Sequence, residues 1–231
     1  MGLRADGVDG EPVNLDDQVR DNEFEDDAPE LPAVLKVDAE VCEALPIADA
    51  ALFADEERPP VAWFVGAHGG AGASTLGRLC APMEDADKQW PAHDALPLCV
   101  VVCRSTRSGL DAAQSAILQA KSGNADACTV LGVVIVADAP GKTPKVLRQR
   151  EKVLEDLTTI WRIPYLAEIR ETTPDSLAVW EPSKPEDKTR RRRRRQKKQP
   201  MTDSVHPALA TVAQTIFNEA YKVFKEKEKE Q

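Results

Sequence analysis

The sequence predicts an α/β domain with three layers, in which a mostly parallel sheet of about four to five strands lies between helices. Two observations support this prediction. Short apolar runs alternate along the chain with segments whose apolar residues recur at helical spacing, which is the pattern of right-handed strand–helix–strand crossovers. The run Leu98–Cys103 is apolar throughout, which is typical of parallel strands that helices cover on both faces.

The predicted elements follow one another in a regular order. Strands are expected at Val61–Val65, Leu98–Cys103, Val130–Ala137 and Ile163–Ile169, the last at an edge because it contains Pro164. Helices are expected at Ser74–Cys80, from Ser108 to Gly123, from a Thr143-Pro144 cap to Leu157, and at Pro207–Lys229. The polar, proline-bearing segment Met83–Pro97 between the first two strands is predicted to be a loop.

Charge divides the chain into parts. Residues 1–60 contain 18 acidic and 4 basic residues, whereas the rest contains 21 acidic and 26 basic residues. We therefore predict an acidic, mostly disordered tail over residues 1–56, because such a sequence buries too little apolar surface to offset its chain entropy. The α/β domain is expected over 57–181, a polybasic linker over 182–204 and an amphipathic helix that packs on the domain over 205–231. The tail contains two apolar patches, Leu31–Leu35 and Val41–Leu52, which can dock on the domain or on a partner. The alternative is an unstructured tail that only keeps the protein in solution.

The sequence also restricts the compartment. It contains no signal-peptide pattern and no apolar run long enough to span a bilayer, so we expect a cytoplasmic protein without a transmembrane segment. Five cysteines without metal-ligand spacing argue against both a disulfide framework and zinc.

The most informative segment is a glycine-rich turn between the first strand and the first helix, His68-Gly-Gly-Ala-Gly-Ala-Ser-Thr75. Glycines allow successive main-chain N–H groups to curl around an anion. We predict that phosphate or a nucleotide binds at His68, Gly69, Gly70, Ala71, Gly72, Ala73, Ser74 and Thr75. The alternative is that the glycines only form a tight corner and bind nothing.

This turn resembles the deviant phosphate loop of the ParA/MinD family of partition and positioning ATPases, Lys-Gly-Gly-x-Gly-Lys-(Ser/Thr)-Thr. The matching residues are Gly69, Gly70, Gly72, Ser74 and Thr75. It is also similar to a loop in a group of short actinobacterial proteins of unassigned activity. The resemblance implies a P-loop-like fold, ATP or ADP as ligand, and Mg²⁺ held by Ser74.

The resemblance also implies a loss of catalysis. His68 and Ala73 occupy the positions of the family's two lysines, so we expect weak binding of a nucleotide or phosphate with little or no hydrolysis, as in a pseudo-ATPase. The resemblance further implies that the protein acts in the segregation or transfer of a DNA element. The alternatives are an active ATPase in which Arg104 and Asp138 substitute for the missing groups, and a DNA-binding or scaffold protein that binds no nucleotide.

Three residues after the later strands are candidate auxiliary residues. Arg104 and Arg107 follow the second predicted strand, at the strand ends where ligands of open α/β sheets bind, and can replace the lost lysine charge. Asp138 follows an apolar strand and can reach a metal, although Asp138-Ala-Pro-Gly141 is also a good turn sequence. His68 has two interpretations, a donor to phosphate or a neutral histidine hydrogen-bonded within the loop.

The C-terminal part contains two further candidate interaction segments. A polybasic tract is expected to bind DNA without sequence specificity, with an anionic membrane, a protein partner or the acidic tail as alternatives. Its residues are Arg190, Arg191, Arg192, Arg193, Arg194, Arg195, Lys197 and Lys198. The last helix is expected to pack on the sheet, with binding of a protein partner or of a second copy as the alternative.

Overall fold

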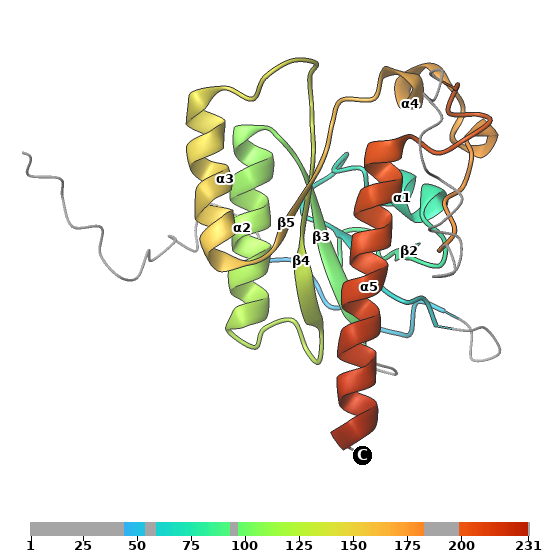
Figure 1. Cartoon of the computed structure of the whole chain (residues 1–231). Coiled ribbons are helices and arrows are strands. Elements are labelled where there is room, and N and C mark those ends of the chain that lie inside the picture. Colours follow the sequence, from blue (N-terminus) through green and yellow to red (C-terminus); the bar gives the residue numbers. More distant parts are fainter. Residues whose placement is uncertain (1–43, 54–58, 93–96, 183–198, 231) are drawn as a thin grey trace, which may run out of the picture. The chain divides into compact units, whose positions relative to one another are not determined.

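The computed structural model describes residues 44–53, 59–92, 97–182 and 199–230, all within the compact unit Val37–Gln231. Its centre is a five-stranded parallel sheet with the order β2-β1-β3-β4-β5 (Figure 1). The strands are β1 (Trp63–Gly66), β2 (Glu84–Asp85), β3 (Leu98–Arg104), β4 (Thr129–Val136) and β5 (Ile160–Ile163). The predicted fold class, an α/β domain with a parallel sheet of four to five strands, is confirmed.

Helices cover both faces of this sheet. The helices are α1 (Ala73–Leu79), α2 (Arg107–Lys121), α3 (Lys145–Leu157), α4 (Ala167–Glu171) and α5 (Pro207–Glu230), with a short 3₁₀ turn, η1 (Pro174–Ser176). The side chains of β3 alternate between two apolar clusters: Val100 and Val102 pack with residues of α1 and α5, whereas Val101 and Cys103 pack with residues of α2 and α3. The two pairs of helices therefore form the outer layers (Figure 1).

Three local predictions differ from the structure. The segment predicted as a loop contains β2, whose two polar residues pair with β1 through the main chain: Glu84 N–H donates to the Ala62 carbonyl over 3.2 Å. The last strand, predicted at Ile163–Ile169, lies at Ile160–Ile163 instead. It ends before Pro164, which has no N–H to continue the ladder, and α4 covers most of the predicted range that remains. Helix α3 begins at Lys145, with Pro144 as its N-cap residue rather than as its first residue.

The packed unit also includes residues 44–53, which the predicted boundary at residue 57 assigned to the tail. Leu45 and Ala48 are buried, and main-chain hydrogen bonds of 2.8 Å join Ala48 to Trp90 and Trp90 to Pro46. Docking on the domain, one alternative for Val41–Leu52, is thus observed for its described part. The rest of the predicted acidic tail, residues 1–43 and 54–56, lies outside the described residues.

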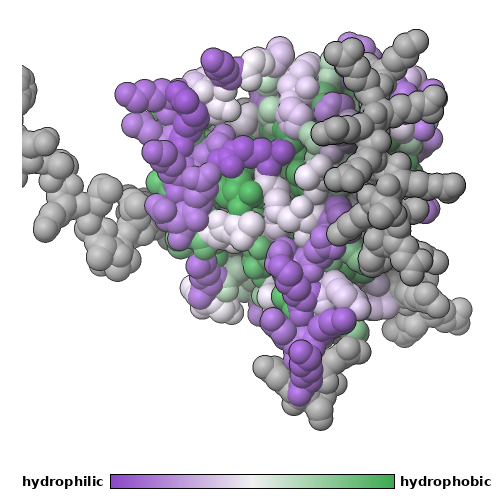
Figure 2. Space-filling model, viewed as in Figure 1, coloured by the Kyte–Doolittle hydropathy of each residue, from purple (hydrophilic) through white to green (hydrophobic). Residues whose placement is uncertain are grey.

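Helix α5 buries one apolar face against β4 and β5 and the same cluster as α1. The buried residues are Leu209, Val212, Ala213, Ile216 and Ala220. Beyond them Tyr221 and Phe224 are half exposed, and Figure 2 shows hydrophilic residues over the C-terminal end of α5 and over α3. No helix in the described part of the chain is long and apolar enough to span a membrane.

Candidate functional site

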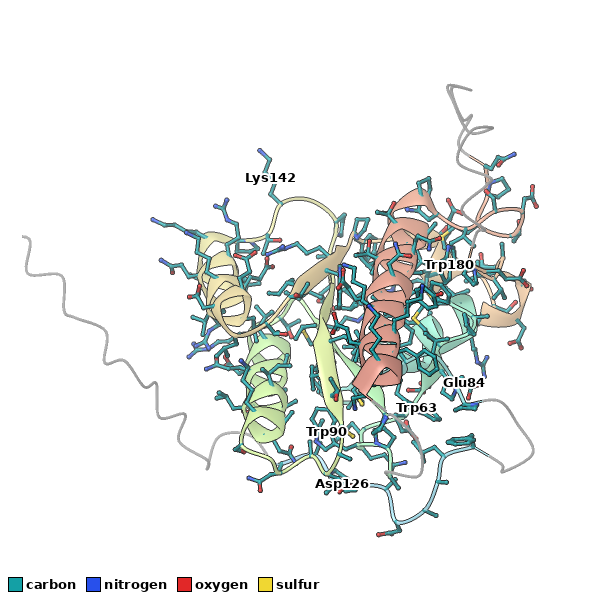
Figure 3. The ribbon with its side chains drawn as sticks, turned by 60° about the horizontal axis from the view of Figure 1, so that its bottom comes forward. Trp63, Glu84, Trp90, Asp126, Lys142 and Trp180 are labelled. Carbon is teal, nitrogen blue, oxygen red and sulfur yellow. The ribbon has the colours of Figure 1, made fainter. Side chains whose placement is uncertain are left out.

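The order of the strands places a crevice at the carboxyl edge of the sheet. From β1 the chain goes to β2 on one side, crosses to β3 on the other side, and continues outward through β4 and β5. Ligands of parallel α/β sheets bind at such a switch point, outside the carboxyl ends of the two strands concerned. Figure 3 shows the two edges: Lys142 follows β4 at the carboxyl edge, whereas Asp126 precedes β4 at the opposite edge.

A pocket of about 340 Å³ lies at this switch point. Its walls come from the residues that follow β1, from the end of β3 and the loop after it, from the second residue after β4, and from helix α4. The lining residues are His68, Gly69, Gly70, Arg104, Thr106, Asp138 and Arg170. Side chains or main chain from three neighbouring strand ends therefore converge on one cavity.

His68 connects the glycine turn to the end of β3. Its Nε2 accepts a hydrogen bond of 3.1 Å from the main-chain N–H of Arg104, and its Nδ1 lies 2.9 Å from the carbonyl oxygen of Gly69. Because the Arg104 N–H can only donate, Nε2 must be unprotonated, and the proton lies on Nδ1, which donates to Gly69. The geometry favours the neutral, loop-bound histidine over the phosphate donor, and both ring nitrogens are occupied.

The Arg104 side chain lies across the pocket. Its Nε donates to the Gly70 carbonyl over 3.2 Å and its Nη1 to the Ala137 carbonyl over 3.5 Å. These acceptors are uncharged, and Arg104 forms no ion pair with a carboxylate in the described part of the chain. A guanidinium group has five N–H donors, so a full positive charge and at least two donors remain available to a ligand.

The glycine turn contributes two lining residues, Gly69 and Gly70, to the same pocket. Gly70 and Gly72 have φ values of 76° and 105°, which other residues adopt only with strain, and the turn closes through a 3.2 Å bond from Ala71 N–H to the His68 carbonyl. Within the described residues, no acceptor is found for the N–H groups of Gly69 and Gly70. An added side-chain carbon at either glycine would meet no atom within 4 Å, so the turn is open to a ligand.

The other residues of the predicted loop are not among the lining residues of the pocket. Ala71 and Ala73 are 3% and 6% exposed and pack into the core, so position 73 faces the interior rather than a ligand. Ser74 and Thr75, in the first turn of α1, are not among the lining residues, and neither is Arg107, whose side chain is 74% exposed and 3.9 Å from Asp111. The tract from Arg190 to Lys198 lies outside the described residues.

Helices α2 and α3 both begin at this edge with a basic residue, Arg107 and Lys145, and neither has an acid in its first turn. A helix N-terminus is itself positive, so these basic residues add to the positive field there. Asp85 at the end of β2 and Asp138 after β4 contribute negative charge to the same edge. In the described part of the chain no group of three or more histidine, cysteine or acidic side chains is arranged to hold a metal ion.

Sequence reasoning missed three residues of the site. Thr106 caps α2 by accepting from the Gly109 N–H over 3.1 Å, and its Thr-x-x-Gly position before a helix was a usable signal. Gly109 lies against the loop, since an added side-chain carbon would lie 2.5 Å from the Arg104 carbonyl and 3.0 Å from His68 Nε2. Arg170 comes from α4, where a strand was predicted.

Arg170 lines the pocket from helix α4. Contact with the Tyr165 hydroxyl, 3.4 Å from Nη1, raises the pKa of its guanidinium, and the nearby Asp138 carboxylate raises that pKa further. Asp138 is itself positioned by the bond of 3.0 Å from its main-chain N–H to the Ser105 hydroxyl. The pocket thus contains two cations and one carboxylate, which leaves it net positive.

The fold and the pocket define the class as a parallel α/β protein with a glycine turn and two arginines at the carboxyl edge of its sheet. The chain belongs to the DUF6668 family, described as a family of unknown function, whose model matches residues 60–180, slightly more than half of the chain. The match includes all seven lining residues. No curated protein shows significant sequence similarity to the chain.

Proposed function

We propose that the protein binds a phosphate-bearing ligand at the carboxyl edge of its sheet, with little or no hydrolysis. The observation that supports this is the convergence of three features in one pocket. They are the N–H groups of Gly69 and Gly70, without an acceptor among the described residues, and the Arg104 guanidinium, without a described carboxylate partner. Such donors complement a phosphate oxyanion.

The positions of the two missing lysines support binding over hydrolysis. His68 is neutral and both of its nitrogens are engaged, and the Ala73 side chain is buried in the core. Neither position offers a cation to a transferring phosphoryl group, the group that such cations stabilise. ATP and ADP with Mg²⁺ are the first ligands to test because of the phosphate-loop resemblance. The DNA partner depends on the tract at residues 190–198, and the segregation or transfer setting on the phosphate-loop resemblance; both remain predictions.

The expected affinity is weak. Two charge-assisted hydrogen bonds contribute about 1.5–3 kcal/mol each, which corresponds to a Kd roughly between tens of micromolar and a few millimolar.

Isothermal titration calorimetry of the full chain with inorganic phosphate, ADP and ATP tests the proposal, and a phosphate-release assay with Mg²⁺-ATP accompanies it. Binding in this range without turnover is expected. No binding of any of these ligands at millimolar concentration would overturn the proposal. Robust turnover that is lost in Arg104→Ala and Asp138→Asn would instead favour the active ATPase alternative, since both residues line the pocket.

A further inference from the structure

The walls of the pocket restrict the chemistry of its ligand. All seven lining residues are polar or glycine, and none is aliphatic or carries a benzene or indole ring. Small-molecule sites are usually lined mostly by apolar and aromatic side chains and have volumes of about 300–1,000 Å³. This pocket, at about 340 Å³, is at the small end of that range. A small, polar ligand fits it better than a nucleobase, because the lining has no apolar wall and only the His68 ring and the two guanidinium groups are surfaces on which a base can stack.

The lining offers two kinds of polar group. The Gly69 and Gly70 N–H groups and the Arg104 guanidinium are donors. Asp138 adds a carboxylate, which accepts hydrogen bonds and repels a second anionic group. The ligand that satisfies both kinds of group carries an anion and also hydrogen-bond donors.

Two further residues of the lining can bind the ligand. The Thr106 hydroxyl accepts from the Gly109 N–H and lies 3.5 Å from the Ser108 hydroxyl, so its own proton can donate either to Ser108 or to a ligand oxygen. Arg170 stands beside Asp138 as a further donor. Groups that both donate and accept, as sugar hydroxyls do, match this mixture of donors and an acceptor.

We propose that the pocket binds a phosphomonoester that carries hydroxyl groups, of the size of a sugar phosphate, with the phosphate at Arg104 and the glycine turn and the hydroxyls at Asp138. This inference rests on the proposed function, because it assigns the ligand class of the same site. The phosphate supplies the anion, the hydroxyls donate to the carboxylate, and the remaining polar groups accept from Arg170 and Thr106.

Titration calorimetry of the full chain with three probes tests the inference: inorganic phosphate, ribose 5-phosphate and AMP. Ribose 5-phosphate is expected to bind at least about tenfold more tightly than inorganic phosphate, because hydrogen bonds to a charged carboxylate add to the phosphate contacts, and at least as tightly as AMP. Asp138→Asn should weaken ribose 5-phosphate binding about tenfold while inorganic phosphate binding stays equal or becomes tighter. Asp175→Asn is the matched control, because that exposed carboxylate pairs with Arg78 outside the pocket.

The outcomes separate the two proposals. Equal binding of inorganic phosphate and ribose 5-phosphate with no effect of Asp138→Asn overturns the sugar-phosphate inference and leaves phosphate binding intact. AMP binding tenfold more tightly than ribose 5-phosphate also overturns the inference, because it requires recognition of the base. Absence of binding by all three probes and by ATP overturns the proposed function itself. Thermal unfolding of Asp138→Asn verifies that the variant is folded.

Discussion

The Arg104→Ala substitution is the sharpest perturbation of the candidate site. It removes the guanidinium that lies between the Gly70 and Ala137 carbonyls but keeps the main-chain N–H that donates to His68, so the turn remains attached to β3. The lost bonds of 3.2 and 3.5 Å are long and partly solvated, and their removal should cost at most about 1 kcal/mol of folding free energy. The lost ligand contact should cost about 1.5–3 kcal/mol of binding free energy, a 10- to 150-fold weaker Kd.

Calorimetry with inorganic phosphate and urea unfolding of the same sample measure these two effects separately. Arg107→Ala is the matched control, because Arg107 lies three residues further on, is exposed and is not among the lining residues of the pocket. Arg104→Lys should have an intermediate effect, since lysine keeps the charge but loses the planar fork. Equal losses of affinity in Arg104→Ala and Arg107→Ala would refute the reasoning, because diffuse positive charge would then explain binding.

Three further predictions concern the surroundings of the site. Gly109→Ala should destabilise the fold by about 1–3 kcal/mol in urea unfolding, since its new carbon would lie 2.5 Å from the Arg104 carbonyl. Gly69→Ala is the control and should be much milder, because its new carbon meets no atom within 4 Å; similar losses of stability in the two variants would contradict the close packing at Gly109. Arg162→Ala should cost about 3–5 kcal/mol, because Glu151, 5% exposed and 2.9 Å from Arg162 Nε, would remain as an uncompensated buried charge; Arg78→Ala, which removes an exposed ion pair, should cost at most about 1 kcal/mol. Burial raises the pKa of Cys80 and of Cys103 from the ordinary value of 9.0 to about 12, with Glu151 as a second cause at Cys103. Because the unfolded thiols then lose their protons first, stability is fully present below pH 9 and falls between pH 9 and about 12, by roughly 1.4 kcal/mol per pH unit for each thiol; an unchanged slope in Cys80→Ala would contradict this.

Much of the fold follows from patterns that the sequence displays directly. The apolar runs at β1, β3 and β4 are continuous because both faces of each strand are buried, and this signal alone predicts a parallel sheet. Strand β2 has no such signal. Glu84 and Asp85 are polar, and their strand geometry depends on main-chain bonds to the neighbours of β1 that no local pattern reveals.

The site could be predicted in part for a topological reason. His68, Gly69, Gly70 and Asp138 follow strands and Arg104 is the last residue of one. The carboxyl ends of parallel strands meet at one edge, so sequence order predicts the convergence of these residues. Arg170 could not be found in this way, because its position depends on the end of β5 at Ile163, just before Pro164, and on the short helix α4. The glycine pattern also does not say that Ala73 faces the core or that Ser74 and Thr75 are not among the lining residues of the pocket.

The main-chain amides and the arginine can be observed directly during ligand binding. Two-dimensional ¹H–¹⁵N nuclear magnetic resonance of the full chain, titrated with inorganic phosphate and then with ribose 5-phosphate, reports on each N–H group separately. The account predicts that the largest saturable shifts occur at the amides of Gly69 and Gly70 and at the Nε–H of Arg104. Shifts confined to the tract at residues 190–198, with these three signals unchanged, would contradict it.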